Sequence, residues 1–177
     1  EAAALLNITP DHLDRYDGFE GYVASKARLF AMQRPDHAAI FGTGDAETAA
    51  IAAAEGARHD PGFVRRGDGA DLVALQPDWP SLQGPHNLQN AAVAIALVEA
   101  LGLTRAQWQP AMPGFRGLPH RMERVAEAGG VLFINDSKAT NPASAAPALA
   151  AFPPNDGQRR IHWILGGLPK REDLDEC

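Results

Sequence analysis

The stretch FINDSKATNP (residues 133–142) passes between two kinds of local structure within a few positions. Phe133 and Ile134 end an apolar run that is typical of a buried strand. Hydrogen-bonding side chains then dominate: Asn135, Asp136, Ser137, Lys138, Thr140 and Asn141. Asn141 is a candidate N-cap, and Pro142 suits the first turn of a helix over 142–152. A strand that runs through a polar loop into a helix favours an α/β protein, in which ligands bind beyond the carboxyl ends of strands.

The same alternation extends over the rest of the chain. Apolar runs predict strands at 2–6, 37–42, 63–66, 70–75 and 161–165. Apolar spacing or alanine-rich composition predicts helices at 18–33, 45–55 and 87–103. Gly102 is a candidate C-cap, and Thr104 is a candidate cap of a short helix that ends near Pro110. Residues 122–135 predict two strands joined at Gly129-Gly130. We therefore predict an α/β fold with largely parallel sheets.

Composition and charge narrow the classes of function. The chain has 177 residues, 45% of them hydrophobic, and a net charge of −6. This composition supports a folded core, and the negative charge argues against nucleic acid as a partner, since such binding needs a basic face. Cys177 is the one cysteine, so no disulfide forms within the chain, which fits a reducing cytoplasm. We find no signal peptide and no apolar stretch long enough to span a membrane.

The chain begins within an apparent strand and ends shortly after another. The opening EAAALLN reads as the later part of a strand, and the last residues follow directly after the apolar run at 161–165. We therefore expect the sequence to be a fragment of a longer protein.

Two side chains near the start of the chain are candidates for metal chemistry. Lys26 lies among the apolar residues of the helix predicted at 18–33, namely Phe19, Tyr22, Val23, Leu29 and Phe30. A lysine in such a position usually reaches water along its methylene stem. The alternative is a partly buried, neutral amine that reacts with carbon dioxide to give a carbamate, an oxygen donor for magnesium. His12 follows the first predicted strand, where it is either a surface residue or a metal ligand oriented by Asp11 and Asp14.

Further polar candidates accompany the later elements. Asn87 and Asn90 lie three residues apart at a predicted helix start. Either Asn87 merely caps the helix, or the two amides read a purine edge. Arg121 is either a solvated charge or a bidentate phosphate ligand. Gly166-Gly167 is either a simple turn or a close approach to a ligand, with Lys170 reaching in. The phosphate-binding pattern G-x-x-x-x-G-K-[ST] occurs nowhere in the sequence.

Taken together, these motifs resemble the Mur ligase family, the ATP-dependent amide-forming enzymes of peptidoglycan precursor synthesis. The match rests on NITPDHLDR, SKARLF, GPHNLQNAAVA, GFRGLPHRMERV, NDSKATN and ILGG with Lys170, in the family's order over nearly the whole chain. NDSKATN resembles the members that add D-glutamate. The resemblance implies that residues 1–111 are the latter part of a P-loop-type central domain. Residues 112–177 would then begin a Rossmann-like C-terminal domain.

The resemblance also implies a reaction. ATP phosphorylates the carboxylate of UDP-N-acetylmuramoyl-L-alanine, and the amine of D-glutamate then displaces phosphate from the acyl phosphate. It implies that Lys26, as a carbamate, and His12 hold Mg²⁺, and that Asn87 and Asn90 contact adenine. Further roles that it implies are nucleotide contacts by Arg121 and Asp136, contacts near the reacting phosphate and D-glutamate by Lys138 and Thr140, and a D-glutamate contact by Lys170.

Two other interpretations remain open. A folylpolyglutamate synthase shares the implied fold and mechanism but adds L-glutamate to a folate, and NDSKATN argues against it. The second is a non-catalytic nucleotide-binding module. We expect this chain alone to be inactive as a ligase, because it lacks the phosphate-binding loop, and we expect the complete enzyme to be a cytoplasmic monomer.

Overall fold

A computed structural model of the chain describes residues 1–10, 15–153 and 160–167. The chain divides into two compact units, which are described separately below. The first unit comprises Glu1–Ala74 and Leu88–Met112, and the second comprises Leu75–Asn87 and Pro113–Cys177. Our boundary at residue 111 refers to the family's domains and stays a prediction.

The first unit contains a parallel sheet in the order β1-β2-β3. Its strands are β1 (Ala2–Leu5), β2 (Ala38–Gly42) and β3 (Val64–Gly67). Helix α1 (Gly18–Ala31) connects the first two strands and α2 (Ala46–Gly56) connects the last two. Parallel neighbours require such crossover connections, because a short turn cannot return the chain to the same end of the sheet. These elements confirm the strands and helices predicted for this part of the sequence.

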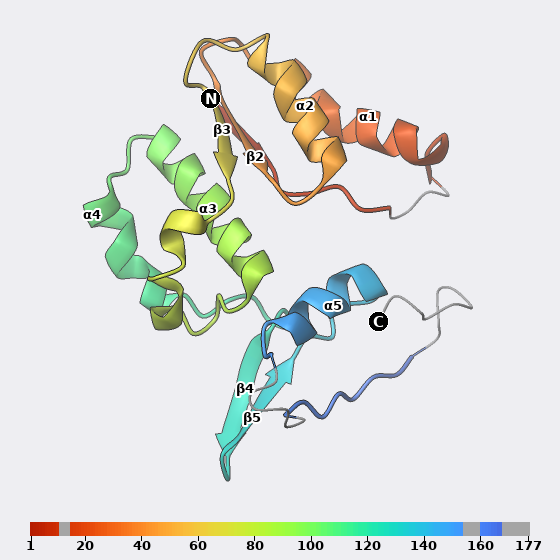
Figure 1. Cartoon of the computed structure of the whole chain (residues 1–177), viewed down its shortest axis with the longest axis vertical. Coiled ribbons are helices and arrows are strands. Elements are labelled where there is room, and N and C mark those ends of the chain that lie inside the picture. Colours follow the sequence, from red (N-terminus) through yellow and green to blue (C-terminus); the bar gives the residue numbers. More distant parts are fainter. Residues whose placement is uncertain (11–14, 154–159, 168–177) are drawn as a thin grey trace. The chain divides into compact units, whose positions relative to one another are not determined.

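Helices cover both faces of this sheet, and β2 is buried along its whole length. Ala39 and Phe41 belong to one hydrophobic cluster with residues of α1 and α2, and the rings of Phe41 and Phe30 lie 4.5 Å apart. Ala38 and Ile40 point the other way and pack with Val93 of α3 (Pro85–Ala100). Figure 1 shows α1 and α2 on one side of β2 and β3 and α3 on the other. A strand between two helical layers needs apolar residues at every position, which explains the unbroken run AAIFG.

Two predictions for the first unit are wrong. Residues 70–75 do not form a strand, because Gly69 turns the chain at φ +78° and Asp68 Oδ1 accepts the backbone N–H of Ala70 at 2.9 Å. This local bond favours a turn, and a 3₁₀ helix, η2 (Ala70–Leu72), follows. Leu29 was placed on the apolar face of α1, yet it is 40% exposed and lies at the edge of the packed face.

The ends of two helices follow the sequence signals. After α3, Gly102 has φ +95° and its N–H donates to Glu99 O, which confirms the predicted C-cap. Thr104 precedes α4 (Arg105–Trp108), and its backbone N–H donates to Gln107 Oε1 at 2.8 Å. The 3₁₀ helix η4 (Gln109–Gly114) follows. The short capped helix was therefore predicted correctly.

The second unit contains an antiparallel hairpin and a helix. Strands β4 (Glu123–Ala128) and β5 (Val131–Asn135) meet at Gly129 and Gly130, whose φ values are +57° and +75°. Two consecutive positive φ angles form the hairpin turn that glycine makes possible. Helix α5 (Pro142–Ala150) begins after Asn141, whose Oδ1 accepts the N–H of Ser144 at 2.9 Å. Both the hairpin and the N-cap were predicted.

The strand predicted at 161–165 is wrong. No strand of the described part of the chain pairs with this segment, and a single extended segment does not form a sheet. Its apolar side chains stay in contact with solvent, with Ile164 95% exposed.

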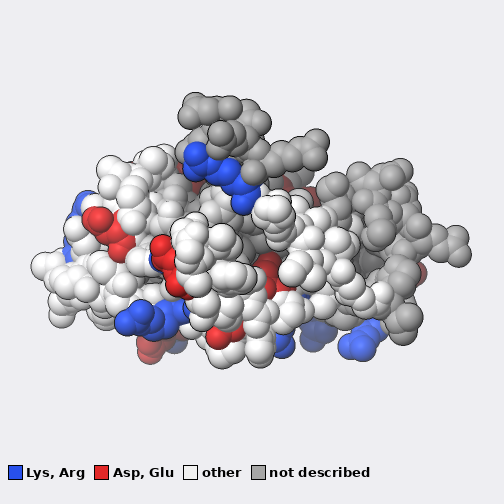
Figure 2. All heavy atoms as spheres, turned by 90° about the horizontal axis from the view of Figure 1, so that it is seen from below, with Lys and Arg blue, Asp and Glu red and all other residues white. Residues whose placement is uncertain are grey.

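Charge distribution and helix length are two further features of the described residues. Among the described residues on the face drawn in Figure 2, lysine and arginine lie in separate small groups, with aspartate and glutamate between them. No helix in the ranges 1–10, 15–153 and 160–167 is both long and apolar enough to cross a membrane.

Candidate functional site

Two backbone hydrogen bonds join the end of β5 to the loop before β4. The N–H of Met122 donates to Asp136 Oδ1 at 2.9 Å, and the N–H of Lys138 donates to His120 O at 3.1 Å. The two bonds involve the residues directly before and after Arg121. They therefore hold the backbone of Arg121 against the segment 135–138. The structure therefore brings together the loops of three predicted site residues: Arg121, Asp136 and Lys138.

The same loop has an unusual backbone. His120 and Met122 have φ values of +65° and +47°, and they are the non-glycine residues with positive φ in the described ranges. Such conformations cost of order 1–3 kcal/mol each and persist only where the surroundings determine them. Two neighbouring side chains hold His120. Glu123 Oε2 accepts its backbone N–H at 2.9 Å, and Asn135 Nδ2 lies 2.9 Å from its Nδ1. The loop is thus held in one strained conformation at the end of β5.

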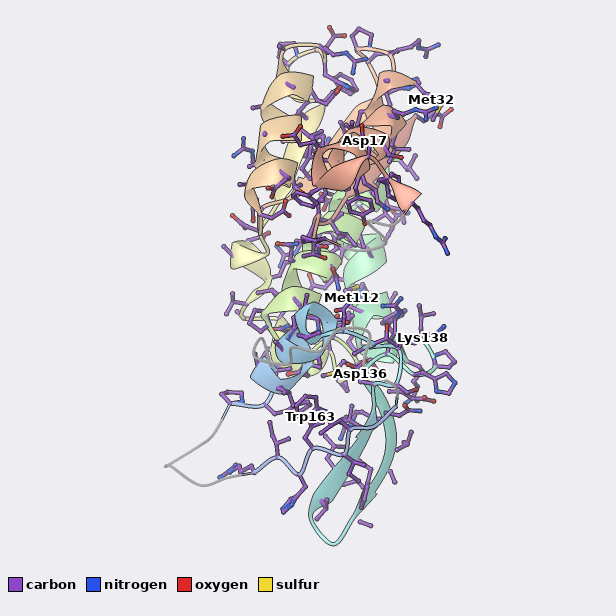
Figure 3. All side chains as sticks on the ribbon, turned by 90° about the vertical axis from the view of Figure 1, so that its right-hand side faces the viewer. Asp17, Met32, Met112, Asp136, Lys138 and Trp163 are labelled. Atoms are coloured by element: carbon purple, nitrogen blue, oxygen red, sulfur yellow. The ribbon has the colours of Figure 1, made fainter. Side chains whose placement is uncertain are left out.

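Two positively charged side chains, one on this loop and one after β5, are exposed to solvent. Arg121 and Lys138 are both exposed, and neither forms a side-chain hydrogen bond or ion pair with another described residue. Figure 3 shows Asp136 and Lys138 where the chain leaves β5. Thr140 is also exposed and lies one residue before the cap of α5. Two cations beside one half-buried carboxylate suit a nucleotide, whose phosphates are anionic and whose ribose offers hydroxyl donors.

The first turns of α3 carry Asn87 and Asn90. The helix begins at Pro85, so Asn87 is its third residue, and the interpretation of Asn87 as the N-cap is wrong. Its Nδ2 instead donates to Gln83 O at 3.0 Å. Both amide side chains are half-buried.

His86 is a site residue that the sequence reasoning missed. Its Nδ1 is buried and has no hydrogen-bond partner among the described residues. Burial lowers the pKa of His86, and the negative charge of Asp136 opposes that shift. A histidine next to Asn87 in GPHNLQN was the available signal, but adjacency alone does not distinguish a buried ring from a solvated one.

We expect His86→Gln to flatten the acid side of the protein's stability profile. The unfolded chain binds the His86 proton with an ordinary pKa near 6.5, whereas the folded chain binds it only at lower pH. Protons therefore favour the unfolded state as the pH falls below about 6.5, and stability is lost down to the lowered pKa. Thermal unfolding of wild type and variant between pH 8 and pH 5 measures the difference, and equal slopes would contradict a buried His86.

Lys26 projects from α1 in the first unit. The side chain is exposed and its Nζ lies 5.1 Å from the centre of the Tyr22 ring. Of the two alternatives for Lys26, the structure fits the side chain that reaches water along its methylene stem, because it extends over an aromatic face into solvent. Its role remains the one implied by the resemblance.

Asp45 holds the start of the loop after β1 through a hydrogen bond. One carboxylate oxygen caps α2 by accepting the N–H of Thr48 at 2.7 Å, and the other accepts the N–H of Ile8 at 3.2 Å. His12, further along this loop, lies outside the described residues, as does Lys170.

A magnesium site is not assembled by the part of the chain that the structure describes. No group of three or more histidine, cysteine, aspartate or glutamate side chains there is arranged to hold a metal ion. Lys26 alone does not constitute a donor set.

Comparisons with known proteins identify the family of this chain. Residues 1–72 match the Mur ligase middle domain, and residues 120–177 match the Mur ligase glutamate ligase domain. UDP-N-acetylmuramoylalanine–D-glutamate ligases from Novosphingobium aromaticivorans and Sphingopyxis alaskensis are 63% and 54% identical over the whole chain. The chain spans 38% and 40% of the lengths of these two relatives.

Solved structures show the same fold. A crystal structure of MurF from Acinetobacter baumannii has a TM-score of 0.64 and 25% identity, over 85% of this chain and 36% of that one. The two family models match in the family's order, the relatives align along the full chain, and the fold is shared. This chain belongs to the Mur ligase family.

Proposed function

We propose that the chain is part of an ATP-dependent ligase that joins D-glutamate to UDP-N-acetylmuramoyl-L-alanine in peptidoglycan precursor synthesis. The observation that carries the proposal is the strained loop fastened to the end of β5, which presents Arg121 and Lys138 beside Asp136. The names of relatives that are up to 63% identical support the choice of D-glutamate.

The proposed first step transfers a phosphoryl group. A carboxylate oxygen of the UDP-linked substrate attacks the γ-phosphorus of ATP, the bond to the β-phosphate oxygen breaks, and ADP leaves. Negative charge gathers on the phosphoryl oxygens, so a guanidinium and an ammonium carried on backbone that is held in place lower the barrier by electrostatic stabilisation. Arg121 supplies a planar, bidentate donor and Lys138 a point charge. Asp136, with one oxygen held by Met122, accepts hydrogen bonds from ribose hydroxyls through its remaining capacity.

The proposed second step forms the amide. The amine nitrogen of D-glutamate attacks the acyl carbon, a proton leaves the nitrogen, and the tetrahedral intermediate expels inorganic phosphate. Lys138 and Thr140 lie where the loop leaves β5, and the resemblance places them beside the incoming amino acid. A cation there favours both the carboxylates of D-glutamate and the oxyanion of the intermediate.

The proposal for the complete enzyme includes Mg²⁺ and a location in the cytoplasm. Magnesium would neutralise phosphate charge when bound, with Lys26 and His12 as the ligands suggested by the resemblance. We further propose that the enzyme is a monomer and that it supports cell shape and division through cell-wall synthesis. The 177 residues alone are expected to be inactive, because they contain no phosphate-binding loop of the G-x-x-x-x-G-K-[ST] type.

Phosphate release by the complete parent enzyme tests the proposal. The assay contains ATP, UDP-N-acetylmuramoyl-L-alanine and one amino acid at a time. We expect release with D-glutamate and only background release with L-glutamate or without an amino acid. Activity with a folate and L-glutamate would support the folylpolyglutamate synthase alternative. Nucleotide binding without turnover on any substrate would support a binding module.

A further inference from the structure

The segment that leads into α3 is held together by two glutamine side chains. Gln76 Nε2 donates to Leu82 O and Gly84 O, both at 2.7 Å. Gln83 Nε2 donates to Gln76 O and Trp79 O, both at 2.8 Å. All four acceptors are backbone carbonyls, so only the NH₂ end of each amide can face them. We call Gln76 and Gln83, with these four bonds, the glutamine clamp.

The glutamine clamp replaces close packing on one side of this segment. A pocket of about 280 Å³ that is partly open to solvent lies within the second unit, lined by Pro77, Pro80, Ser81, Gln83, Met122, Arg124, Leu132, Ile134 and Phe152. Side chains packed on all sides normally fix a loop. Here one side of the segment borders the open pocket, so the clamp and the buried Trp79, which is 2% exposed, hold its shape.

The clamp is connected to a proposed nucleotide contact. The carbonyl of Gln83, the residue whose side chain closes the clamp, accepts Nδ2 of Asn87 at 3.0 Å. This bond fixes which end of the Asn87 amide faces the loop, and it turns Oδ1 to the opposite side. A carbonyl oxygen accepts more than one hydrogen bond, and it suits the amino group of adenine, whereas it repels the O6 acceptor of guanine.

We propose that Gln76 and Gln83 are positioning residues that orient the Asn87 amide and thereby set the preference of the nucleotide site for adenine over guanine. The inference rests on the proposed function, because it takes Asn87 to contact the base. It adds to that function two side chains that do not themselves touch the nucleotide.

The test uses the complete enzyme and the variant Gln83→Met, which keeps the side-chain length but removes both donors. The control is Gln109→Met in η4, a half-buried glutamine of the first unit whose Oε1 accepts the Nε–H of Arg105. Calorimetry measures the binding of ADP and GDP, and steady-state assays measure KM for ATP and for D-glutamate. Thermal unfolding of each protein reports its stability.

We expect Gln83→Met to weaken ADP binding about tenfold, since an Asn87 amide that holds the binding orientation only about a tenth of the time lowers the apparent affinity by that factor. The ratio of ADP to GDP affinity should fall by a similar factor, KM for ATP should rise, and KM for D-glutamate should stay within about twofold. Gln109→Met should match wild type. A lower melting temperature with an unchanged ADP to GDP ratio would show that the clamp is only structural, and would overturn the proposal.

The variant Gln76→Met covers the case in which Gln83→Met does not fold, because it removes the two bonds of Gln76 and keeps the two side-chain bonds of Gln83. An unchanged ADP to GDP ratio in Gln76→Met would also overturn the proposal. The binding measurement separates this inference from the proposed function. If the wild-type enzyme binds ADP selectively but does not turn over D-glutamate, the proposed function is refuted and the role of the clamp can still be tested. If the wild type binds neither ADP nor GDP, the proposed role of the clamp is refuted.

Discussion

Lys26→Ala in the complete enzyme is expected to lower kcat/KM by roughly a thousandfold, with little change in stability. A group that helps hold a catalytic metal ion contributes several kcal/mol, and about 4 kcal/mol corresponds to a factor of a thousand in rate. The side chain is exposed and contacts the Tyr22 ring, an interaction of about 0.5–1 kcal/mol at such a site. Phosphate release at saturating D-glutamate, together with thermal unfolding, measures both effects.

Two further variants identify what Lys26 contributes. Lys26→Arg keeps the positive charge and the contact with Tyr22 but cannot form a carbamate, so it should be as inactive as Lys26→Ala. Full activity in Lys26→Arg would show that a cation suffices and would remove the proposed role in metal binding. Arg28→Ala changes another exposed cation of α1 and should retain activity.

Gly42→Ala is expected to destabilise the first unit by about 3 kcal/mol. A Cβ at this position would lie 2.0 Å from Leu6 O and 2.7 Å from Gln89 Nε2. Gln89 Nε2 itself donates to Leu6 O at 3.1 Å, so the methyl group would enter a hydrogen bond that joins α3 to the chain after β1. Neither the backbone carbonyl nor the end of β2 can move without disturbing the parallel pairing. For a chain of this size the loss corresponds to a fall of roughly 6–12 °C in melting temperature.

Gly56→Ala is the matched control for Gly42→Ala. Gly56 is the last residue of α2, and a Cβ there would meet no atom within 4 Å. Alanine at such a position is neutral or stabilises by up to about 1 kcal/mol, because it restricts the unfolded chain. Urea unfolding of both variants compares the two sites directly. Equal stability of Gly42→Ala and wild type would contradict the tight contact between Gly42 and Leu6.

Local signals in the sequence were sufficient for most elements of the fold. The hairpin at Gly129-Gly130, the cap at Asn141 and the buried strand AAIFG each depend on residues within a few positions of one another. The strand predicted at 161–165 failed because a strand also needs a partner, which an apolar run does not reveal. The strand predicted at 70–75 failed because a single Asp68 side-chain bond outweighed a short apolar pattern.

The candidate site was only partly predictable for a similar reason. Asp136, Lys138 and Arg121 could be selected because charged residues next to a strand end are conspicuous in sequence. The groups that hold Asp136 and Lys138 are not conspicuous, since Met122 acts through its backbone N–H and His120 through its backbone carbonyl. Gln76, which holds the segment before α3, acts through bonds to carbonyls six and eight residues away. The exposure of Lys26 was left open between two alternatives, because helical spacing identifies a face but not how far a long side chain extends beyond it.

The exposed segment IHWIL has a consequence for the solubility of the chain. Short runs with high strand propensity and little charge associate edge to edge with other copies when nothing covers them. Ile164 is 95% exposed, and the run contains no acidic or strongly basic side chain. The sequence places Arg159 and Arg160 directly before it. Adjacent arginines repel those of a second copy, so this pair acts as a gatekeeper against aggregation.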